Sequence, residues 1–323
     1  GRGEGRFIAD SVRRATGVRL EVAALARDRS RQLDAGGIGM STSAPFGVAR
    51  LGLSTMPVTF RDAAGSYSAR RDGIDIQYGG PGRVQLVASG ARWSVDRAGD
   101  APWEGRLAAE LAPAPRLSLL AEIARAVVQE TRRSFPGPDD AALAPSGVHA
   151  TTSRAGFATW WRALDLRASA SIGRYEGAGL EPNERLGVDA DAGLVVHSHA
   201  PWVRVGYAFR AQHFDYDAFD VSAGASRYGG YFSPDRHEVH LGVLQLSHRF
   251  GGALLLEFDG RLGGQQVRSV PGRLSDARVA VVTYTHAAWR LTRGLDLDVV
   301  FLHVDAFEAF RLNELRAGLR HTF

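Results

Sequence analysis

The chain closes with Glu314-Leu315-Arg316-Ala317-Gly318-Leu319-Arg320-His321-Thr322-Phe323, in which side chains of two kinds take turns. Leucine, alanine, histidine and the terminal phenylalanine occupy the odd positions, while charged, small or hydroxyl residues occupy the even ones. Successive side chains of a β-strand point to opposite faces. The run therefore predicts a strand with one largely apolar face and one polar face, and it ends on an aromatic residue.

The same two-residue period returns along the whole chain. It is clearest in the segments Val18–Ala24, Ile74–Tyr78, Leu164–Ile172, Leu186–Leu194, Val203–Phe209 and Leu295–Phe301. About fifteen such segments occur, separated by glycine-rich turns or by longer polar stretches. The segment Leu117–Gln129 fits a strand and also fits a helix, because its apolar residues are dense. The sequence thus predicts an all-β protein.

Alternation alone fits two architectures equally. In a soluble sandwich the apolar faces pack on each other, and in a membrane barrel they face lipid while the polar faces line the lumen. No apolar run approaches the roughly 20 residues that a membrane-spanning helix needs. The terminal strand ending in Phe323 resembles the signal that the outer-membrane barrel-assembly machinery reads, which favours the barrel. We therefore predict a single closed antiparallel transmembrane β-barrel of about 16 strands.

Turn and loop lengths fit this prediction. Short glycine turns, such as Gly36–Gly39 and Gly79–Gly82, contrast with two long polar stretches, Phe135–Arg154 and Asp215–Asp235. Outer-membrane barrels have short turns at one end and long loops at the other. Aromatic residues near segment ends suit interfacial girdles, namely Trp93, Trp103, Trp160, Trp161, Trp202, Tyr207 and Trp289. We assign residues 1–16 to a leader or linker and residues 17–323 to the barrel.

Composition excludes several classes of protein. The chain has 323 residues, no cysteine, and 39 basic residues, all arginine, against 35 acidic ones. Without cysteine there is no disulfide framework, thiolate zinc site or cysteine nucleophile. The acids interleave with the arginines, so we expect no nucleic-acid partner. The chain opens at Gly1 without a signal-peptide core, so we expect a mature chain or the C-terminal part of a longer one.

One stretch of the sequence is more specific to a protein family than the two-residue alternation is. The run Gly229, Gly230, Tyr231, Phe232, Ser233 and Pro234 resembles the Gly-Gly-Tyr-Phe-Ser-Pro signature in the C-terminal barrel of the tetratricopeptide-repeat export porins that serve cellulose synthase as its C-type component. Further similarity to that family lies in Gly37–Ser41, Pro57–Phe60, Gly173–Gly177, Glu181–Arg185 and Phe214–Asp217. The motif glycines permit unusual backbone conformations, and Tyr231 and Phe232 can pin a long loop to the barrel wall. A structural role and polymer contact both remain open for this motif.

The resemblance implies a pore in the bacterial outer membrane that exports a nascent exopolysaccharide, cellulose or a related β-glucan. It implies as partners the polysaccharide chain, outer-membrane lipid, the barrel-assembly machinery, periplasmic tetratricopeptide repeats and an inner-membrane synthase complex. Neither a cofactor nor catalysis is expected. A general outer-membrane porin for small solutes is the alternative, and a barrel-borne hydrolase is a third possibility.

The polar faces of the predicted strands supply candidate pore-lining residues. They are Asp165, Arg167, Asp189, Asp191, Arg204, Arg210, Glu257, Asp259, Asp296, Asp298, Arg316 and Arg320. Their mixed signs suit a neutral polymer, because many weak contacts allow a chain to keep moving. His197 and His199 have the spacing of a metal pair on one strand face, but no third ligand lies at a suitable distance. We interpret them as part of a surface turn and expect no metal.

Overall fold

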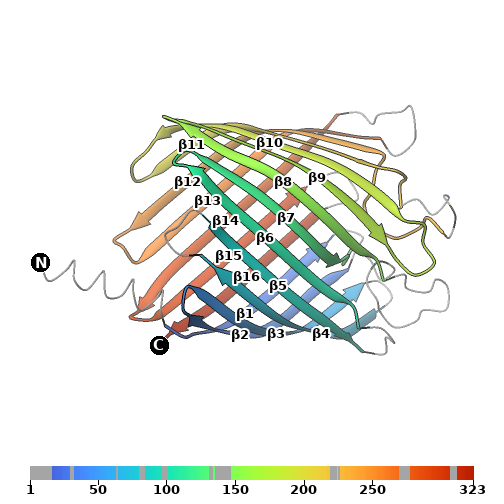
Figure 1. Cartoon of the computed structure of the whole chain (residues 1–323), viewed down its shortest axis with the longest axis horizontal. Helices are drawn as coiled ribbons and strands as arrows, with labels where there is room; N and C mark the ends of the chain where they lie inside the picture. Colours follow the sequence, from blue (N-terminus) through green and yellow to red (C-terminus); the bar gives the residue numbers. More distant parts are fainter. Residues whose placement is uncertain are drawn as a thin grey trace, which may run out of the picture.

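The computed structural model describes residues 17–29, 33–62, 65–79, 84–96, 101–130, 134, 147–218, 224, 226–268, 277–305 and 311–323. Sixteen strands pair in sequence order and β16 pairs with β1, which closes one antiparallel barrel (Figure 1). The strands are β1 (Arg19–Arg29), β2 (Asp34–Phe46), β3 (Ala49–Asp62), β4 (Gly65–Tyr78), β5 (Val84–Val95), β6 (Trp103–Ala114), β7 (Leu117–Val127), β8 (His149–Trp161), β9 (Leu164–Glu176), β10 (Asn183–His197), β11 (Trp202–Phe214), β12 (Arg236–Phe250), β13 (Leu254–Arg268), β14 (Arg278–Thr292), β15 (Leu295–Asp305) and β16 (Arg311–Thr322). The all-β class, the closed barrel and the count of 16 are confirmed. The leader or linker predicted for residues 1–16 lies outside the described residues.

The ambiguous segment from Leu117 is a strand. β7 pairs with β6 on one side and with β8 on the other, so its backbone groups are satisfied by neighbours and not by helical turns. Its side chains alternate accordingly, with Leu119 and Ile123 exposed on the outer face. Among the described residues, no helix is long and apolar enough to cross a membrane.

The two ends of the barrel differ. At one end, which we call the turn end, strands are joined by short turns such as Gly47-Val48 and Arg162-Ala163, and the start of β1 and the end of β16 lie there (Figure 1). The opposite end, the loop end, carries the long connections, including Asp215–Asp235 between β11 and β12 as predicted. The predicted loop Phe135–Arg154 is wrong at its C-terminal boundary, which lies too far along the chain. β8 begins at His149, because Arg154 pairs with Glu122 and Ser171 inside the sheet.

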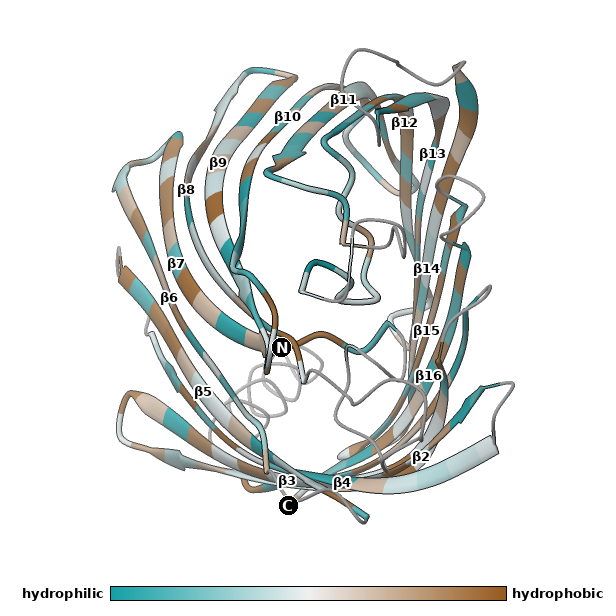
Figure 2. Ribbon diagram, turned by 90° about the vertical axis from the view of Figure 1, so that its right-hand side faces the viewer, coloured by the Kyte–Doolittle hydropathy of each residue, from teal (hydrophilic) through white to brown (hydrophobic). Residues whose placement is uncertain are grey.

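The apolar faces of the strands look outward. Leu166, Val188 and Val205 are 39%, 47% and 41% exposed, where a soluble sandwich would have buried them at its centre. Directly paired residues share a face, and Val22, Leu319 and Leu297 form such an apolar row across β1, β16 and β15. Figure 2, viewed along the barrel, shows apolar and polar residues alternating along the strands. The sandwich alternative is therefore wrong for this chain.

Gly36, Gly37 and Gly39 form part of β2 and not a turn, which corrects the prediction for Gly36–Gly39. A Cβ on Gly37 would lie 2.1 Å from the carbonyl oxygen of Pro57, and one on Gly39 would lie 2.7 Å from that of Thr55. The glycines are explained by this close approach of β2 and β3, which leaves no room for a side chain.

The predicted aromatic girdle is only partly observed. Trp161 and Trp289 are 60% and 50% exposed on the outer face near strand ends. Trp93 is 3% exposed and packs on Phe60 inside the barrel, with ring centroids 6.0 Å apart. Trp160 shares the inward face with Asp165, its partner across β8 and β9. Sequence position near a strand end does not reveal which face a ring occupies.

The inside of the barrel has two parts at the loop end. Inward side chains from β2 to β5 and from β7 pack into an apolar cluster that fills the space between those strands. It comprises Leu33, Ala35, Val58, Phe60, Tyr67, Ala69, Trp93, Val95 and Val127. The open space lies on the other side, between β6 and β15.

Candidate functional site in the lumen

A cavity of about 1130 Å³ runs through the lumen and is the candidate functional site. Its lining comes from strands β6 to β15 and from loop-end connections. Trp160 and Asp165 border it at the turn end, and Glu130 and Phe232 border it at the loop end. This space extends from Trp160 near the turn end to Glu130 and Phe232 at the loop end, so it is the candidate path for a solute or a polymer.

All twelve candidate pore-lining residues lie on the inward face of their strands. The pairings of β9 to β13 place Asp165, Arg167, Asp189, Asp191, Arg204, Arg210, Glu257 and Asp259 there. Those of β14 to β16 and β1 place Asp296, Asp298, Arg316 and Arg320 there. The residues next to them along each strand point outward and belong to the apolar face, which is how strand alternation separates the two sets.

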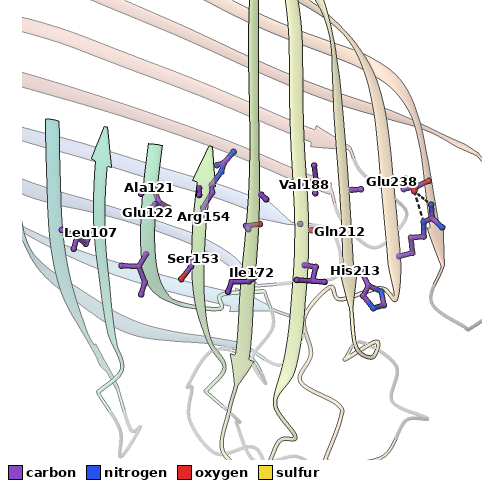
Figure 3. Close-up of a pocket in the computed structure, with 18 of the residues that line it drawn as sticks. Leu107, Ala121, Glu122, Ser153, Arg154, Ile172, Val188, Gln212, His213 and Glu238 are labelled. Atoms are coloured by element: carbon purple, nitrogen blue, oxygen red, sulfur yellow. Dashed lines mark hydrogen bonds and ion pairs between the residues drawn. The ribbon is translucent and has the colours of Figure 1, made fainter. Parts of the chain in front are cut away.

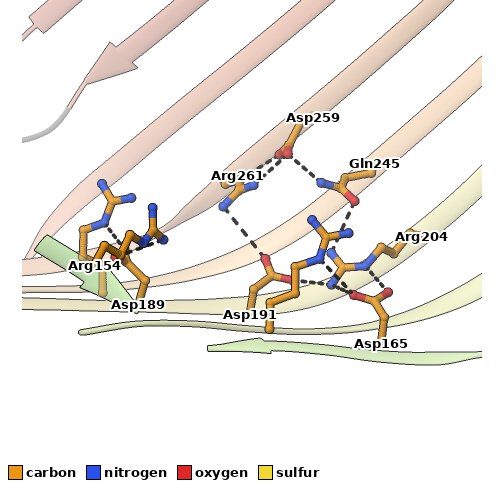
Figure 4. Close-up of polar contacts among 10 residues, drawn as sticks. Arg154, Asp165, Asp189, Asp191, Arg204, Gln245, Asp259 and Arg261 are labelled. Carbon is orange, nitrogen blue, oxygen red and sulfur yellow. Dashed lines mark hydrogen bonds and ion pairs between the residues drawn. The ribbon is translucent and has the colours of Figure 1, made fainter. Parts of the chain in front are cut away.

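Five strands contribute to one ionic network in the wall (Figure 4). Arg204 of β11 donates from Nε and Nη2 to the two carboxylate oxygens of Asp165, at 2.6 and 2.7 Å, and also bonds Asp191. Gln245 of β12 connects this group to Asp259, which accepts two hydrogen bonds of 2.8 Å from Arg261. Arg204 is 1% exposed. A planar guanidinium shared by two carboxylates holds this part of the wall in one geometry.

The remaining candidates are also paired. Arg210 lies 2.6 Å from Asp189. His286, which was not among the predicted residues, sits between Glu257 and Asp298 at 2.8 and 3.1 Å. Other contacts are Arg316 with Glu314, Arg320 with Glu21, Arg167 with Asp165 at 4.0 Å, and an electrostatic contact of Asp296 with Arg19. Each of these lumenal acids thus has a basic group beside it.

Several further lumenal charges were not predicted. They form the pairs Arg27–Glu314, Arg71–Glu104 and Arg106–Glu122, at 2.6, 2.8 and 2.7 Å. The signal was present, because the alternation in Trp103–Ala114 puts Glu104 and Arg106 on the face opposite to Leu107 and Leu111, and that in Arg19–Arg29 puts Arg27 opposite to Leu20 and Val22, although Leu25 shares the face of Arg27. Applying the same rule to every strand would have found them.

The motif Gly229, Gly230, Tyr231, Phe232, Ser233 and Pro234 lies at the loop end, in the connection between β11 and β12. Tyr231 is 2% exposed and stacks on Tyr175 of β9, with ring centroids 5.0 Å apart and planes 13° from parallel. Gly230 has a φ of 68°, and a Cβ on Gly229 would lie 2.4 Å from the Tyr231 ring. Burial raises the pKa of the Tyr231 hydroxyl far above its usual range. These contacts pack the motif against the wall.

A second chain segment enters the loop end from the opposite side. Val128–Glu130, which we call the crossing segment, leaves β7 and reaches β1 and the β1–β2 connection. Leu33 donates its N–H to the Glu130 carbonyl at 2.9 Å, and Arg29 bonds the Gln129 carbonyl. The Glu130 carboxylate accepts the N–H of Phe232 at 2.7 Å. The surrounding protein withdraws this carboxylate from water and raises its pKa above the ordinary value.

A separate hollow of about 1090 Å³ lies along the wall of β6 to β12 (Figure 3). Its apolar lining comes from outward residues such as Leu107, Ile123 and Ile172, whose side chains are at least half exposed. Small residues, Ala121 and Ala155 among them, form its floor. This hollow belongs to the lipid-facing surface and not to the path through the barrel.

The remaining candidates lie at the turn end. His197 ends β10, and its Nδ1 lies 2.6 Å from the carbonyl oxygen of Pro201 in the β10–β11 turn that also holds His199. Among the described residues, no three or more His, Asp or Glu side chains are arranged to hold a metal ion. Phe323 is 60% exposed beside the ring of His321, and its N–H bonds the carbonyl of Val18 at 3.0 Å. The terminal residue therefore extends the pairing of β16 with β1 at the turn end.

Known proteins resemble this one in structure and not in sequence. No protein-family model matches the sequence, and neither does any curated protein. A structure described as a bacterial polysaccharide outer membrane secretin superposes with a TM-score of 0.70 at 11% identity, over 95% of this chain and 99% of the other. CdiB from Acinetobacter baumannii superposes with a TM-score of 0.51 at 11% identity, over 95% of this chain and 60% of the other.

At these identities the likeness concerns the fold. The closed ring, the apolar outer face, the charged lumen and the unequal ends are together the properties of a barrel that sits in a bilayer. Both similar structures superpose over nearly the whole of this chain, so what they share with it is the barrel itself. The chain is a 16-stranded β-barrel of the bacterial outer membrane.

Proposed function

We propose that this barrel is the outer-membrane exit for an uncharged exopolysaccharide, cellulose or a related β-glucan. The turn end faces the periplasm, where outer-membrane barrels keep their short turns. Periplasmic tetratricopeptide repeats and an inner-membrane synthase, implied by the family resemblance, deliver the polymer there. The barrel itself catalyses nothing. The likeness to a polysaccharide secretin and the motif Gly229–Pro234 both support an export role.

The observation that carries the proposal is the pairing of charge along the lumen. Asp165 and Asp191 share Arg204, Asp259 is bound by Arg261, and Asp189 by Arg210. A wall of closed ion pairs has little net field, so it neither traps a polycation nor holds a polyanion. The same groups still exchange hydrogen bonds with hydroxyls. This chemistry suits a neutral sugar chain.

Aromatic rings add a second kind of weak contact. Trp160 and Tyr284 both line the cavity and are 43% and 37% exposed. The C–H faces of a pyranose ring are apolar, so an exposed indole can stack on them. Rings alternating with paired charges give a sugar polymer many weak contacts and no tight one, as passage requires.

Neighbouring tryptophans provide the experiment. Trp160 faces the lumen, whereas Trp161 faces lipid and is 60% exposed there. In cells lacking the native gene, Trp160→Ala should lower secreted polymer severalfold and leave polymer in the periplasm. Trp161→Ala, with equal surface abundance, should secrete as wild type. Equal secretion by both variants, or unchanged secretion after deletion of the gene, would refute the proposal.

A general porin for small solutes is the second candidate. It is favoured by chain segments that lie inside the opening at the loop end of the barrel, which we call the mouth, as the crossing segment does. A porin of this kind conducts ions steadily when reconstituted, and its deletion impairs uptake of small solutes. Steady large conductance of the wild-type barrel together with normal polymer secretion by the deletion strain would select the porin.

A further inference from the structure

The lumenal cavity ends where two chain segments meet. Glu130, from the crossing segment, and Phe232, from the motif, are both among its lining residues at the loop end. On the β2–β7 side, the apolar cluster around Phe60 and Trp93 occupies the space. Among the described residues, the contact between Glu130 and Phe232 therefore bounds the cavity at the loop end.

On the motif side, the contact between Glu130 and Phe232 is fixed to the barrel wall. Tyr231 stacks on Tyr175, and Ser233 accepts the N–H of Ala218 at 2.7 Å. The N–H groups of Gly229 and Gly230 both bond the Ala218 carbonyl. This half of the mouth is fixed to the barrel by buried rings and several hydrogen bonds.

The crossing segment is held in a different way. Val128 packs against the buried cluster that contains Tyr231, and its N–H bonds the carbonyl of Val148 at 2.9 Å. Beyond Val128 the links are polar: Leu33 to the Glu130 carbonyl, Arg27 and Arg29 to Gln129, and the Glu130 carboxylate to the Phe232 N–H. Polar contacts of this kind exchange readily with water, whereas a buried stacked ring does not. Gln129 and Glu130, at the tip of the crossing segment, are therefore the residues whose contacts water can replace.

We propose that Glu130 is the latch of an exit gate: its carboxylate holds the crossing segment against the backbone of Phe232, and loss of this contact opens the lumen to the outside. This rests on the proposed function for the identity of what passes, but the gate itself concerns any solute. The side-chain oxygen is the essential element, because it accepts the Phe232 N–H at 2.7 Å and so joins the two halves of the mouth directly.

Two substitutions separate the parts of the latch. Glu130→Ala removes the acceptor, and Glu130→Gln keeps an acceptor oxygen without the charge. A hydrogen bond that does not depend on charge corresponds to roughly 2- to 10-fold in an equilibrium. In planar bilayers, purified wild type should be mostly closed, Glu130→Ala should raise open probability by about that factor, and Glu130→Gln should stay closed.

The matched control is Glu176→Ala. Glu176 ends β9 at the same end of the barrel and pairs with Arg174 on the surface, 48% exposed, away from the mouth. It should gate as wild type. Each variant must first show the heat-modifiable migration of a folded barrel, so that loss of fold is not read as opening.

The absence of cysteine permits a reversible lock. The Leu33 N–H donates to the Glu130 carbonyl at 2.9 Å, so a pair of cysteines at these two positions is the lock to test. Leu33→Cys with Glu130→Cys should be shut when oxidised and open like Glu130→Ala when reduced. Equal open probability in wild type and Glu130→Ala, or an oxidised pair that conducts freely, overturns the latch. Ion current needs no polymer, so a working latch in a barrel that secretes none would reject the proposed export and leave the latch intact.

Discussion

At the scale of single residues, the most constrained group in the lumen is the Arg204 guanidinium. Its side chain is 2% exposed and serves both Asp165 and Asp191. Removing it leaves two carboxylates facing each other without their cation. Breaking a buried ion pair in this way costs about 3 kcal/mol or more.

Arg204→Met should therefore lower the free energy of unfolding by about 3 kcal/mol, measured by urea titration of the barrel in lipid vesicles with tryptophan fluorescence. Arg167→Met is the control, because its side chain is 66% exposed and only 4.0 Å from Asp165. That change should cost about 0.5 kcal/mol or less. Equal losses for the two variants would contradict a structural role for the network.

Glu130 predicts a pH dependence of the gate. Its pKa is raised when the surrounding protein covers it, and Arg27 and Arg29 of β1, Tyr175 of β9 and Tyr231 are the charged or titratable groups around it. A raised pKa in the closed form means that the closed form is favoured most below the ordinary value of about 4.3. This advantage is lost as pH rises through the raised pKa. Open probability should therefore increase as pH rises above that ordinary value and through the raised pKa. It should stay flat in Glu130→Gln, and a flat wild-type profile would exclude this titration.

At the scale of elements, β2 shows how closely two strands approach. Gly37 has no room for a Cβ beside Pro57, while a Cβ on Gly36 would lie at an ordinary 3.7 Å from the carbonyl oxygen of Leu25. Gly37→Ala should reduce the fraction that refolds into a heat-modifiable barrel severalfold, and Gly36→Ala should refold as wild type. Equal refolding yields for the two variants would show that β2 and β3 are farther apart.

Alternation was sufficient to predict the strands and their two faces, because a two-residue period is a local property. The closed barrel was predicted from the terminal strand that ends in Phe323. Alternation placed Asp165, Arg204 and Asp298 on the lumenal face because the period is local. It could not separate Trp93, which packs inside, from Trp161, which faces lipid, since both lie near strand ends. Gly36–Gly39 was assigned to a turn by composition, whereas the reason for Gly37 and Gly39 is contact with another strand.

The contacts at the mouth of the barrel could not be predicted from the sequence, for a different reason. Glu130 is a single acid in a polar stretch, and nothing in its neighbourhood predicts a partner about a hundred positions away at Phe232. The partnership arises from closure of the ring, which brings the ends of β7, β1 and β11 together at the loop end. The motif itself was visible in the sequence, but its stacking on Tyr175 was not.

At the scale of the whole molecule, the barrel combines an apolar outer wall with a lumen of paired charges and exposed rings. The wall fixes where the protein resides, and the lumen determines what passes. An uncharged polymer would meet paired charges along the cavity between Trp160 and Glu130, while a charged one would have to break ion pairs to bind. The proposed export function depends on this preference for neutral chains.

The most direct measurement of that preference is current blockade in planar bilayers through the Glu130→Ala barrel, which should be open. Neutral cello-oligosaccharides added on the turn side should interrupt the current, and blockade should weaken in the Trp160→Ala background. Oligosaccharides of the same length bearing carboxylates or free amines should block far less. Blockade by the charged chains equal to or stronger than that by the neutral ones would contradict the proposed function.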